Sequence, residues 1–373
     1  MVSLKDIRKS NAQLQFLPPG LVAVFSGATS GIGLGTLTAL IKFAKAPKVY
    51  IIGRDHEKGA KIIAELEKLN SEASLIFFEA QFSLIRDVDR ISREILRIED
   101  HVDILCMSPG NVNLGVRQGE VELTSSDLDI HWQSLDTSEG IDTDLALQYY
   151  SRMRLLTNLL PLLEKSISPR VISILAPGFE GPLDPTDFDF RSPNRYAFIH
   201  ATLGAITMTD LIFEELAKLH PAVSFIHSNP GYVGTRILDH TLSNISGLLW
   251  YPAQIPRYTF LPIYRALFCI TPEESGERHL FLATSGKYPP NQVHEKGKID
   301  GFVDRPFDTP FAKSTASTDG RGNGVYRIKE DGEACKDSAI LQRYRAGGLG
   351  KKVFEHTNEE WDMALSPHGP NGT

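Results

Sequence analysis

Residues Val22–Gly35 read VAVFSGATSGIGLG, and this stretch decides the fold class. The apolar, β-branched run Leu21–Phe25 predicts a buried strand, and the apolar-periodic segment Leu34–Ala44 predicts a helix. Only a short glycine-rich turn separates the two segments. Strand, turn and helix therefore follow one another in the order of a dinucleotide-binding βα unit, and this context makes the glycine pattern informative.

The three glycines of this turn are spaced G-x-x-x-G-x-G, and each position has a physical reason. Gly27 lets the chain turn sharply off the end of the strand. Gly31 and Gly33 lack a Cβ atom, so a pyrophosphate and the next helix can approach the backbone closely. The free N–H groups at the start of that helix favour an anion. The turn therefore predicts a binding site for the pyrophosphate of a dinucleotide.

Composition excludes several other classes of function. The net charge is −7 in 373 residues, with no basic block, which argues against nucleic acid as a main partner. The three cysteines are far apart and form no C-x-x-C motif, so we expect neither a disulfide framework nor a metal site. Prolines and arginines interrupt the apolar stretch Ile245–Ile270, and the N-terminus lacks the apolar core of a signal peptide. We therefore expect a cytoplasmic protein without a transmembrane segment.

Short apolar runs alternate with helical periods along the chain after the glycine turn. The predicted strands are 21–25, 48–52, 74–80, 102–107, 170–175 and 223–227, and the predicted helices are 34–44, 57–69, 84–98, 143–163 and 196–219. This alternation predicts right-handed βαβ units and a doubly wound, Rossmann-type parallel sheet with helices on both faces.

The predicted organisation is a single α/β domain with additions. Residues 1–17 form an N-terminal segment, and residues 18–290 form the Rossmann-type domain. Within it, the proline- and aromatic-rich insertion 235–272 is interpreted as a lobe that covers the substrate, or alternatively as ordinary core. Residues 291–373 are interpreted as a peripheral C-terminal extension, with helices near 337–349 and 357–365.

Several motifs resemble the short-chain dehydrogenase/reductase family over residues 18–285. They are SGATSGIG (26–33), Gly53-Arg54, DILCMSPG (103–110), Tyr196 at the head of a long helix, and NPGYVGT (229–235). EESGERHLFLATS (273–285) is similar to the closing segment of retinol-dehydrogenase-like members, and residues 207–231 are similar to fungal members that act in secondary metabolism. The resemblance also implies a homodimer formed through 84–98 and 196–219.

The resemblance implies a set of residues that hold NADP(H). They are Gly27, Thr29, Ser30, Gly31, Ile32, Gly33, Arg54, Gln81, Phe82, Ser108, Pro109, Gly110, Tyr196, Pro230, Gly231, Val233 and Thr235. Gly53 stands where NAD-dependent folds carry an acid, and the Arg54 guanidinium suits the 2′-phosphate of NADP. The adjacent Asp55 is an alternative partner for the ribose. Gln81 replaces the acid expected near the adenine, and its carboxamide can still accept from the adenine amino group.

The expected catalytic residues are Tyr196 and His200. Tyr196 matches the family tyrosine, whereas His200 stands where Y-x-x-x-K requires lysine. The family serine falls on Ala176, and the family asparagine falls near Gln148 or Tyr149. An unperturbed histidine is mostly neutral at pH 7, so it lowers the tyrosine pKa less than a lysine would. Carbonyl reduction needs the protonated phenol, and the sequence therefore favours reduction over alcohol oxidation.

Three functions remain open from the sequence. The first is an NADPH-dependent reductase of a carbonyl or activated double bond in a bulky, apolar metabolite. The second is a non-redox enzyme, such as a cyclase, isomerase or dehydratase, because the acidic loop Glu180–Arg195 offers acid–base groups, unless it is a solvated loop. The third is an NADP-binding protein without turnover.

Overall fold

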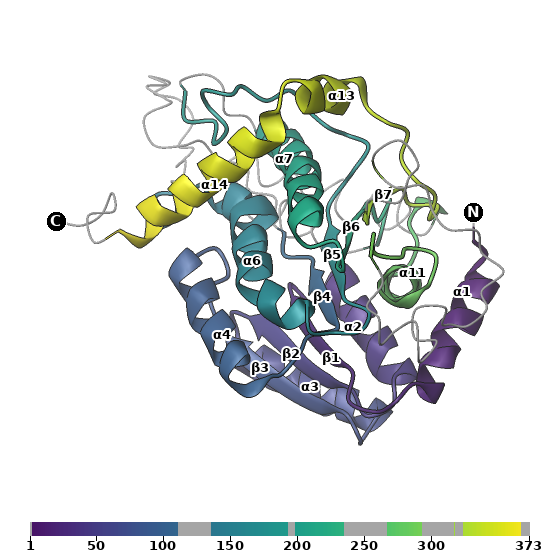
Figure 1. Cartoon of the computed structure of the whole chain (residues 1–373). Coiled ribbons are helices and arrows are strands. Elements are labelled where there is room, and N and C mark those ends of the chain that lie inside the picture. The colour runs from purple at the N-terminus through teal and green to yellow at the C-terminus, as the bar shows by residue number, and fades with distance from the viewer. Residues whose placement is uncertain are drawn as a thin grey trace, which may run out of the picture.

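A seven-stranded, wholly parallel sheet forms the centre of the molecule in the computed structural model, which describes residues 2–110, 136–192, 198–234, 267–292, 317 and 324–366 (Figure 1). The strands are β1 (Val22–Ser26), β2 (Lys48–Gly53), β3 (Ser74–Glu79), β4 (Ile104–Met107), β5 (Arg170–Ile174), β6 (Ser224–Ser228) and β7 (Val325–Ile328). Their order is β3-β2-β1-β4-β5-β6-β7. The order reverses between β1 and β4, so the predicted doubly wound fold is confirmed, with its switch point at the end of β1.

Helices cover both faces of the sheet. The helices α2 (Gly31–Phe43), α3 (His56–Leu69) and α11 (Pro272–Thr284) pack on one face, and α4 (Ile85–Ile98), α6 (Ser151–Leu163) and α7 (Phe198–Leu219) pack on the other. The N-terminal helix α1 (Leu4–Asn11) and the short η1 (Ala12–Phe16) lie beside α11 and α2.

Two glycines allow the helices α2 and α11 to touch backbone to backbone. A Cβ atom added to Gly276 of α11 would lie 2.6 Å from the backbone nitrogen of Thr36, and one added to Gly35 of α2 would lie 2.9 Å from the carbonyl carbon of Pro272. Real Cβ atoms do not approach a backbone atom this closely, so neither position accepts a side chain without a shift of one helix.

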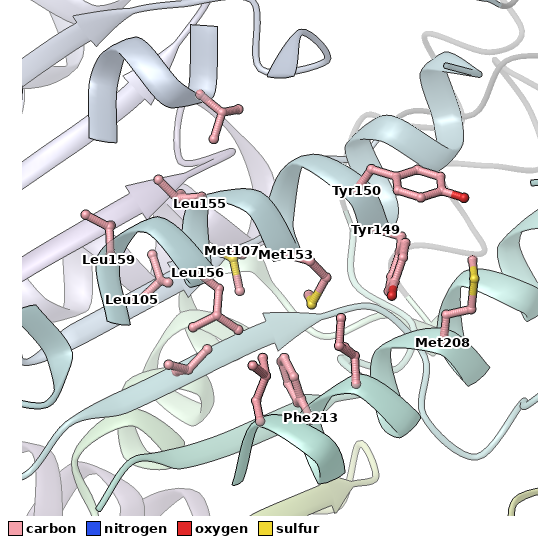
Figure 2. Packing of buried hydrophobic residues seen from close by; sticks show 14 of the residues in the cluster. Leu105, Met107, Tyr149, Tyr150, Met153, Leu155, Leu156, Leu159, Met208 and Phe213 are labelled. Atoms are coloured by element: carbon pink, nitrogen blue, oxygen red, sulfur yellow. The ribbon is translucent and has the colours of Figure 1, made fainter. Parts of the chain in front are cut away.

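The segment predicted as one helix over 143–163 contains a break in its first half. It consists of α5 (Thr143–Leu145), a π-helical turn η2 (Ala146–Tyr150) and α6. Figure 2 shows Tyr149 and Tyr150 projecting from this region, while Met153, Leu156 and Met107 lie in the core between α6 and the sheet. Single π turns recur at functional sites, and this one precedes a buried arginine discussed below.

The prediction that 291–373 is a peripheral extension is wrong for its described part. Strand β7 completes the sheet beside β6, and all four of its residues are buried. The helices α13 (Ala339–Ala346) and α14 (Leu349–Leu365) follow, and α14 begins eight residues before the helix expected at 357. The seventh strand was missed because four residues between polar segments carry too little periodicity to stand out.

Helix α14 belongs to the core rather than to the surface. Figure 1 shows it crossing α7 and α6 towards α4. Its Trp361 is 2% exposed and donates from Nε1 to the carbonyl oxygen of Tyr150 at 3.2 Å. Between 204 and 217, every residue of α7 except Glu215 is buried, so the face of α7 expected to meet a second copy is covered by the chain itself.

Two sequence expectations concern residues that the structure does not describe in full. Residues 235–266 of the expected substrate-covering insertion lie outside the described residues. None of the helices in the described ranges is both long enough and apolar enough to span a bilayer.

Candidate functional site

The glycine turn after β1 forms the centre of the candidate site. Gly27 and Gly31 have φ values of +77° and +57°, which favour glycine. A Cβ atom on Gly27 would lie 2.6 Å from Cα of Pro109, and one on Gly33 would lie 2.5 Å from the carbonyl oxygen of Gly27. The side chain of Ser30, at the start of α2, makes no capping hydrogen bond. The first turn of α2 therefore lacks a side-chain cap from Ser30, as a site for an external anion requires.

The segment after β4 lies against this turn. Ser108 donates from its hydroxyl to the carbonyl oxygen of Gly27 at 3.3 Å, and Pro109 lies beside Gly27. Residues 108 and 109, predicted from the sequence, are thus brought to the glycine turn, and Gly110 follows them directly. Gly33 is required for this contact, because its added Cβ would meet the Ser108 hydroxyl.

The end of β2 explains the absence of an acid at position 53. A Cβ atom on Gly53 would lie 2.7 Å from Cγ2 of Thr29 and 2.9 Å from Cζ of Phe77. Arg54 is exposed and has no ion-pair partner among the described residues. The Asp55 carboxylate caps α3 by accepting from the backbone nitrogen of Lys58 at 2.9 Å. Of the two candidates for a ribose or its phosphate, Asp55 is therefore already in use.

The remaining predicted cofactor residues lie at the same edge of the sheet. Gln81 follows β3, and its side-chain amide donates to the Ser83 hydroxyl at 3.1 Å, while Phe82 beside it is buried. After β6, Gly231 has a φ of +67° and its backbone nitrogen donates to Asn229 at 2.9 Å. Pro230 and Val233 lie in the segment after β6, and Val233 pairs with Ile270. Ile32 lies in the first turn of α2. Thr235 lies outside the described residues.

The expected catalytic pair is described only in part. Tyr196 lies outside the described residues, and His200 is an exposed residue in the first turn of α7. Ser173, three residues before Ala176, does not compensate for the missing serine, because it is buried and its hydroxyl accepts from Arg152 at 2.9 Å.

The asparagine position is occupied by buried groups. The Tyr149 hydroxyl and the Thr357 hydroxyl of α14 lie 2.8 Å apart, and burial raises the pKa of Tyr149 well above its usual value. Gln148 is buried as well. Both residues near the position expected for the family's asparagine are therefore buried and present no exposed polar group.

The acidic loop is a structural feature and not a solvated one, which corrects that interpretation. Asp187 and Asp189 are each 8% exposed, and Asp187 accepts from the backbone nitrogen of Arg191 at 2.7 Å. Glu180 forms an ion pair with the buried Arg327 of β7. Arg191 also pairs with Glu360 of α14 at 2.8 Å. Glu180 thus attaches β7 to the loop and Arg191 attaches α14, while Asp187 is held within the loop, which weakens the case that these are free acid–base groups.

One buried residue at this edge was missed by sequence reasoning. Arg152 of α6 is 1% exposed, and it donates to acceptors at the ends of β4 and β5. Burial lowers its pKa to about 9, so it remains charged at neutral pH. The signal available in the sequence was an arginine among the apolar positions of a helix, where a charge needs a specific partner.

Comparisons with known proteins place this geometry among enzymes. No family model matches the chain. Oxidoreductase AN1596 of Emericella nidulans is 37% identical over 369 residues, which cover 98% of this chain and 99% of that protein. Short-chain dehydrogenase/reductase SAT2 of Stachybotrys chartarum is 28% identical, with 96% of each chain covered.

Solved structures share the fold. The L-sorbose reductase of Gluconobacter frateurii, complexed with NADPH and L-sorbose, has a TM-score of 0.50 at 18% identity and covers 72% of this chain and 90% of its own. RhlG of Pseudomonas aeruginosa, in an NADP complex, has a TM-score of 0.50 at 20% identity, and the match covers 74% of this chain and 95% of RhlG. The two relatives match this chain along almost their whole length, and one of them is named for the family. These matches, together with the shared fold, confirm the resemblance: the chain belongs to the short-chain dehydrogenase/reductase family.

Proposed function

We propose that this protein is an NADPH-dependent reductase of a carbonyl or an activated double bond in a bulky, apolar metabolite. The observation that carries the proposal is the fit between the site and a 2′-phosphorylated dinucleotide. Gly27 and Gly33 let Pro109 and Ser108 pack directly against the glycine turn, and Ser30 does not cap the α2 terminus at that turn. Arg54 is exposed and has no ion-pair partner among the described residues. The solved reductases with NADPH and NADP support the same cofactor by analogy of fold.

The residues divide between the two halves of the cofactor. Arg54 would bind the 2′-phosphate with its planar guanidinium, and Gln81 and Phe82 would lie near the adenine. The glycine turn would hold the pyrophosphate through backbone amides. Ser108–Gly110 and Pro230–Thr235, at the ends of β4 and β6, would line the nicotinamide half, as would Tyr196.

The chemistry proposed for the chain's own residues is proton donation. The bound cofactor would supply a hydride to the substrate. Tyr196 would protonate the oxygen or carbon that becomes electron-rich, and His200 would assist. A tyrosine without a neighbouring lysine keeps a high pKa, and the protonated phenol is the form that reduction needs. A protonated Tyr196 would therefore favour reduction over oxidation.

The apolar nature of the substrate and a role in secondary metabolism are further parts of the proposal. The basis for the first is the composition of 235–272, and for the second the similarity to fungal oxidoreductases. We propose a cytoplasmic location on composition alone.

A second candidate is an NADP-binding protein without turnover. It is favoured by Ser173 and Tyr149, whose hydroxyls are taken up in buried hydrogen bonds instead of facing a substrate. The third candidate, a non-redox enzyme, has less support, because Glu180 and Asp187 of the acidic loop are held by an ion pair and a hydrogen bond within the protein.

The experiment combines binding with turnover. Purified protein is titrated calorimetrically with NADPH and NADH, and NADPH consumption is followed with a panel of apolar ketones, aldehydes and enones. Binding of NADPH with turnover that disappears in Tyr196→Phe supports the reductase. Tight binding without consumption supports the second candidate. A product with unchanged hydrogen content supports the third, and no affinity for either nucleotide refutes all NADP-based functions.

A further inference from the structure

The buried guanidinium of Arg152 joins three segments of the chain. Its Nε donates to the carbonyl oxygen of Leu147, in the π turn η2, at 2.9 Å. Its Nη1 donates to the Ser173 hydroxyl at 2.9 Å and to the carbonyl oxygen of Ile174 at 2.8 Å, both on β5. Its Nη2 donates to the carbonyl oxygen of Pro109, beyond the end of β4. All three nitrogens of the group are therefore used.

This arginine has no carboxylate partner among the described residues. Buried arginines normally pair with an acid, because removing a charge from water costs several kcal/mol. Here the compensation comes from backbone carbonyls and one hydroxyl. A buried cation that only neutral acceptors compensate is a costly way to fill space, and an apolar residue of similar volume would fill it without the charge. Its position therefore calls for a specific role.

The segment that Arg152 holds is the one that touches the glycine turn. Pro109 accepts from Arg152 on one side and lies against Gly27 on the other. Arg152 also donates weakly to the carbonyl oxygen of Met107, at 3.4 Å, so it contacts the segment on both sides of Ser108. Two adjacent strand ends, β4 and β5, are thus fixed to each other at the edge where the cofactor is proposed to bind.

We propose that Arg152 is a positioning residue that fixes residues 107–110 as the floor under the nicotinamide half of the cofactor. The inference rests on the proposed NADPH function. Arg152 would have no influence on the adenosine half, because the segments after β2 and β3 would bind that half. Lysine cannot replace it, because a single ammonium group lacks the planar set of donors that reaches all three segments.

The test compares ligands that carry different halves of the cofactor. Arg152→Lys, Arg152→Gln and the wild type are titrated with NADPH and with 2′,5′-ADP, which lacks the nicotinamide half. Arg154→Gln is the matched control, because Arg154 lies two residues further along α6 and pairs with Asp89 at 2.6 Å instead. We expect both Arg152 variants to bind NADPH at least about tenfold more weakly and 2′,5′-ADP within about twofold of the wild type. The control should match the wild type with both ligands.

Retained binding of 2′,5′-ADP also shows that a variant is folded. If Arg152 served stability alone, affinity for both ligands would fall together, and that result overturns the inference. Unchanged NADPH binding by Arg152→Lys and Arg152→Gln overturns it as well. A wild type that binds neither ligand refutes the proposed function instead. As a second measurement, ethylguanidinium ion should restore NADPH binding to Arg152→Ala, and failure of this rescue in a variant that still binds 2′,5′-ADP counts against the inference.

Discussion

Replacement of Arg54 by glutamine tests how the protein selects a phosphorylated nucleotide. Arg54 is exposed and has no ion-pair partner among the described residues, so its loss removes no known ion pair of the protein itself. A hydrogen bond to a charged group contributes about 1.5–3 kcal/mol, and we take the lower end because the site is open to solvent. About 1.4 kcal/mol corresponds to a tenfold change in affinity. We therefore expect the Kd for NADPH to rise about tenfold, while the Kd for NADH stays within about twofold.

Calorimetric titration at low and high salt measures both values. The wild-type preference for NADPH should weaken at high salt, because the contact lies between exposed charges. Arg97→Gln, at an exposed position of α4, is the control and should change neither affinity. An equal loss for NADPH and NADH would refute the assignment of Arg54 to the 2′-phosphate. Gly53→Asp should not create a preference for NADH, because a Cβ there would lie 2.7 Å from Thr29.

Four further predictions concern stability and assembly. Gly276→Ala should lower the stability by about 1–3 kcal/mol and lower the Tm, because its Cβ would lie 2.6 Å from the Thr36 nitrogen; Gly347→Ala, whose Cβ would make only ordinary contact, is the control. Trp361→Ala should lower the free energy of unfolding by about 3–5 kcal/mol, because Trp361 is buried. Light scattering of the intact wild-type chain should show a monomer, because α14 covers α7. A dimer formed through α7 would contradict this packing. Burial lowers the pKa of His279 from 6.5 to about 4, so the unfolded chain binds this proton more readily than the folded one. The free energy of unfolding should therefore be unaffected by this group above pH 6.5 and should fall by about 3 kcal/mol as the pH drops towards 4. The Tm of His279→Gln should depend less on pH over this range than that of the wild type. An equal pH dependence of the two Tm values would contradict the shift.

The parts of the fold predicted from sequence are those with strong local signals. Strands β1 to β6 are short buried apolar runs, and the glycine turn lies between β1 and α2 as expected. The predicted bounds of these six strands differ from the observed ones by at most two residues, because hydrogen bonding rather than hydrophobicity sets where a strand ends. Strand β7 was missed because it has only four residues, which lie between polar segments. Periodicity reports the face that a segment buries and not the neighbour it pairs with.

The arrangement of the glycine turn was more predictable than that of the expected catalytic positions. Gly27, Gly33, Ser108 and Pro109 come together as the motifs implied, because bare glycines are needed wherever two backbones approach. Gly53 proved to be fixed by its neighbours Thr29 and Phe77, which no local pattern reveals. Arg152 was overlooked for the same reason, since its acceptors belong to segments up to 45 residues away.

The segment near the position expected for the family's asparagine and the C-terminal helix α14 form one structural unit. The Tyr149 hydroxyl lies 2.8 Å from that of Thr357, and Trp361 donates to the backbone of Tyr150, so this segment binds α14. The relatives cover 96–98% of this chain, whereas the solved reductases cover 72–74%. A tyrosine that anchors a helix cannot also hold a proton relay, because its hydroxyl is buried and occupied. Tyr149 therefore serves to hold α14 against the π turn that precedes α6.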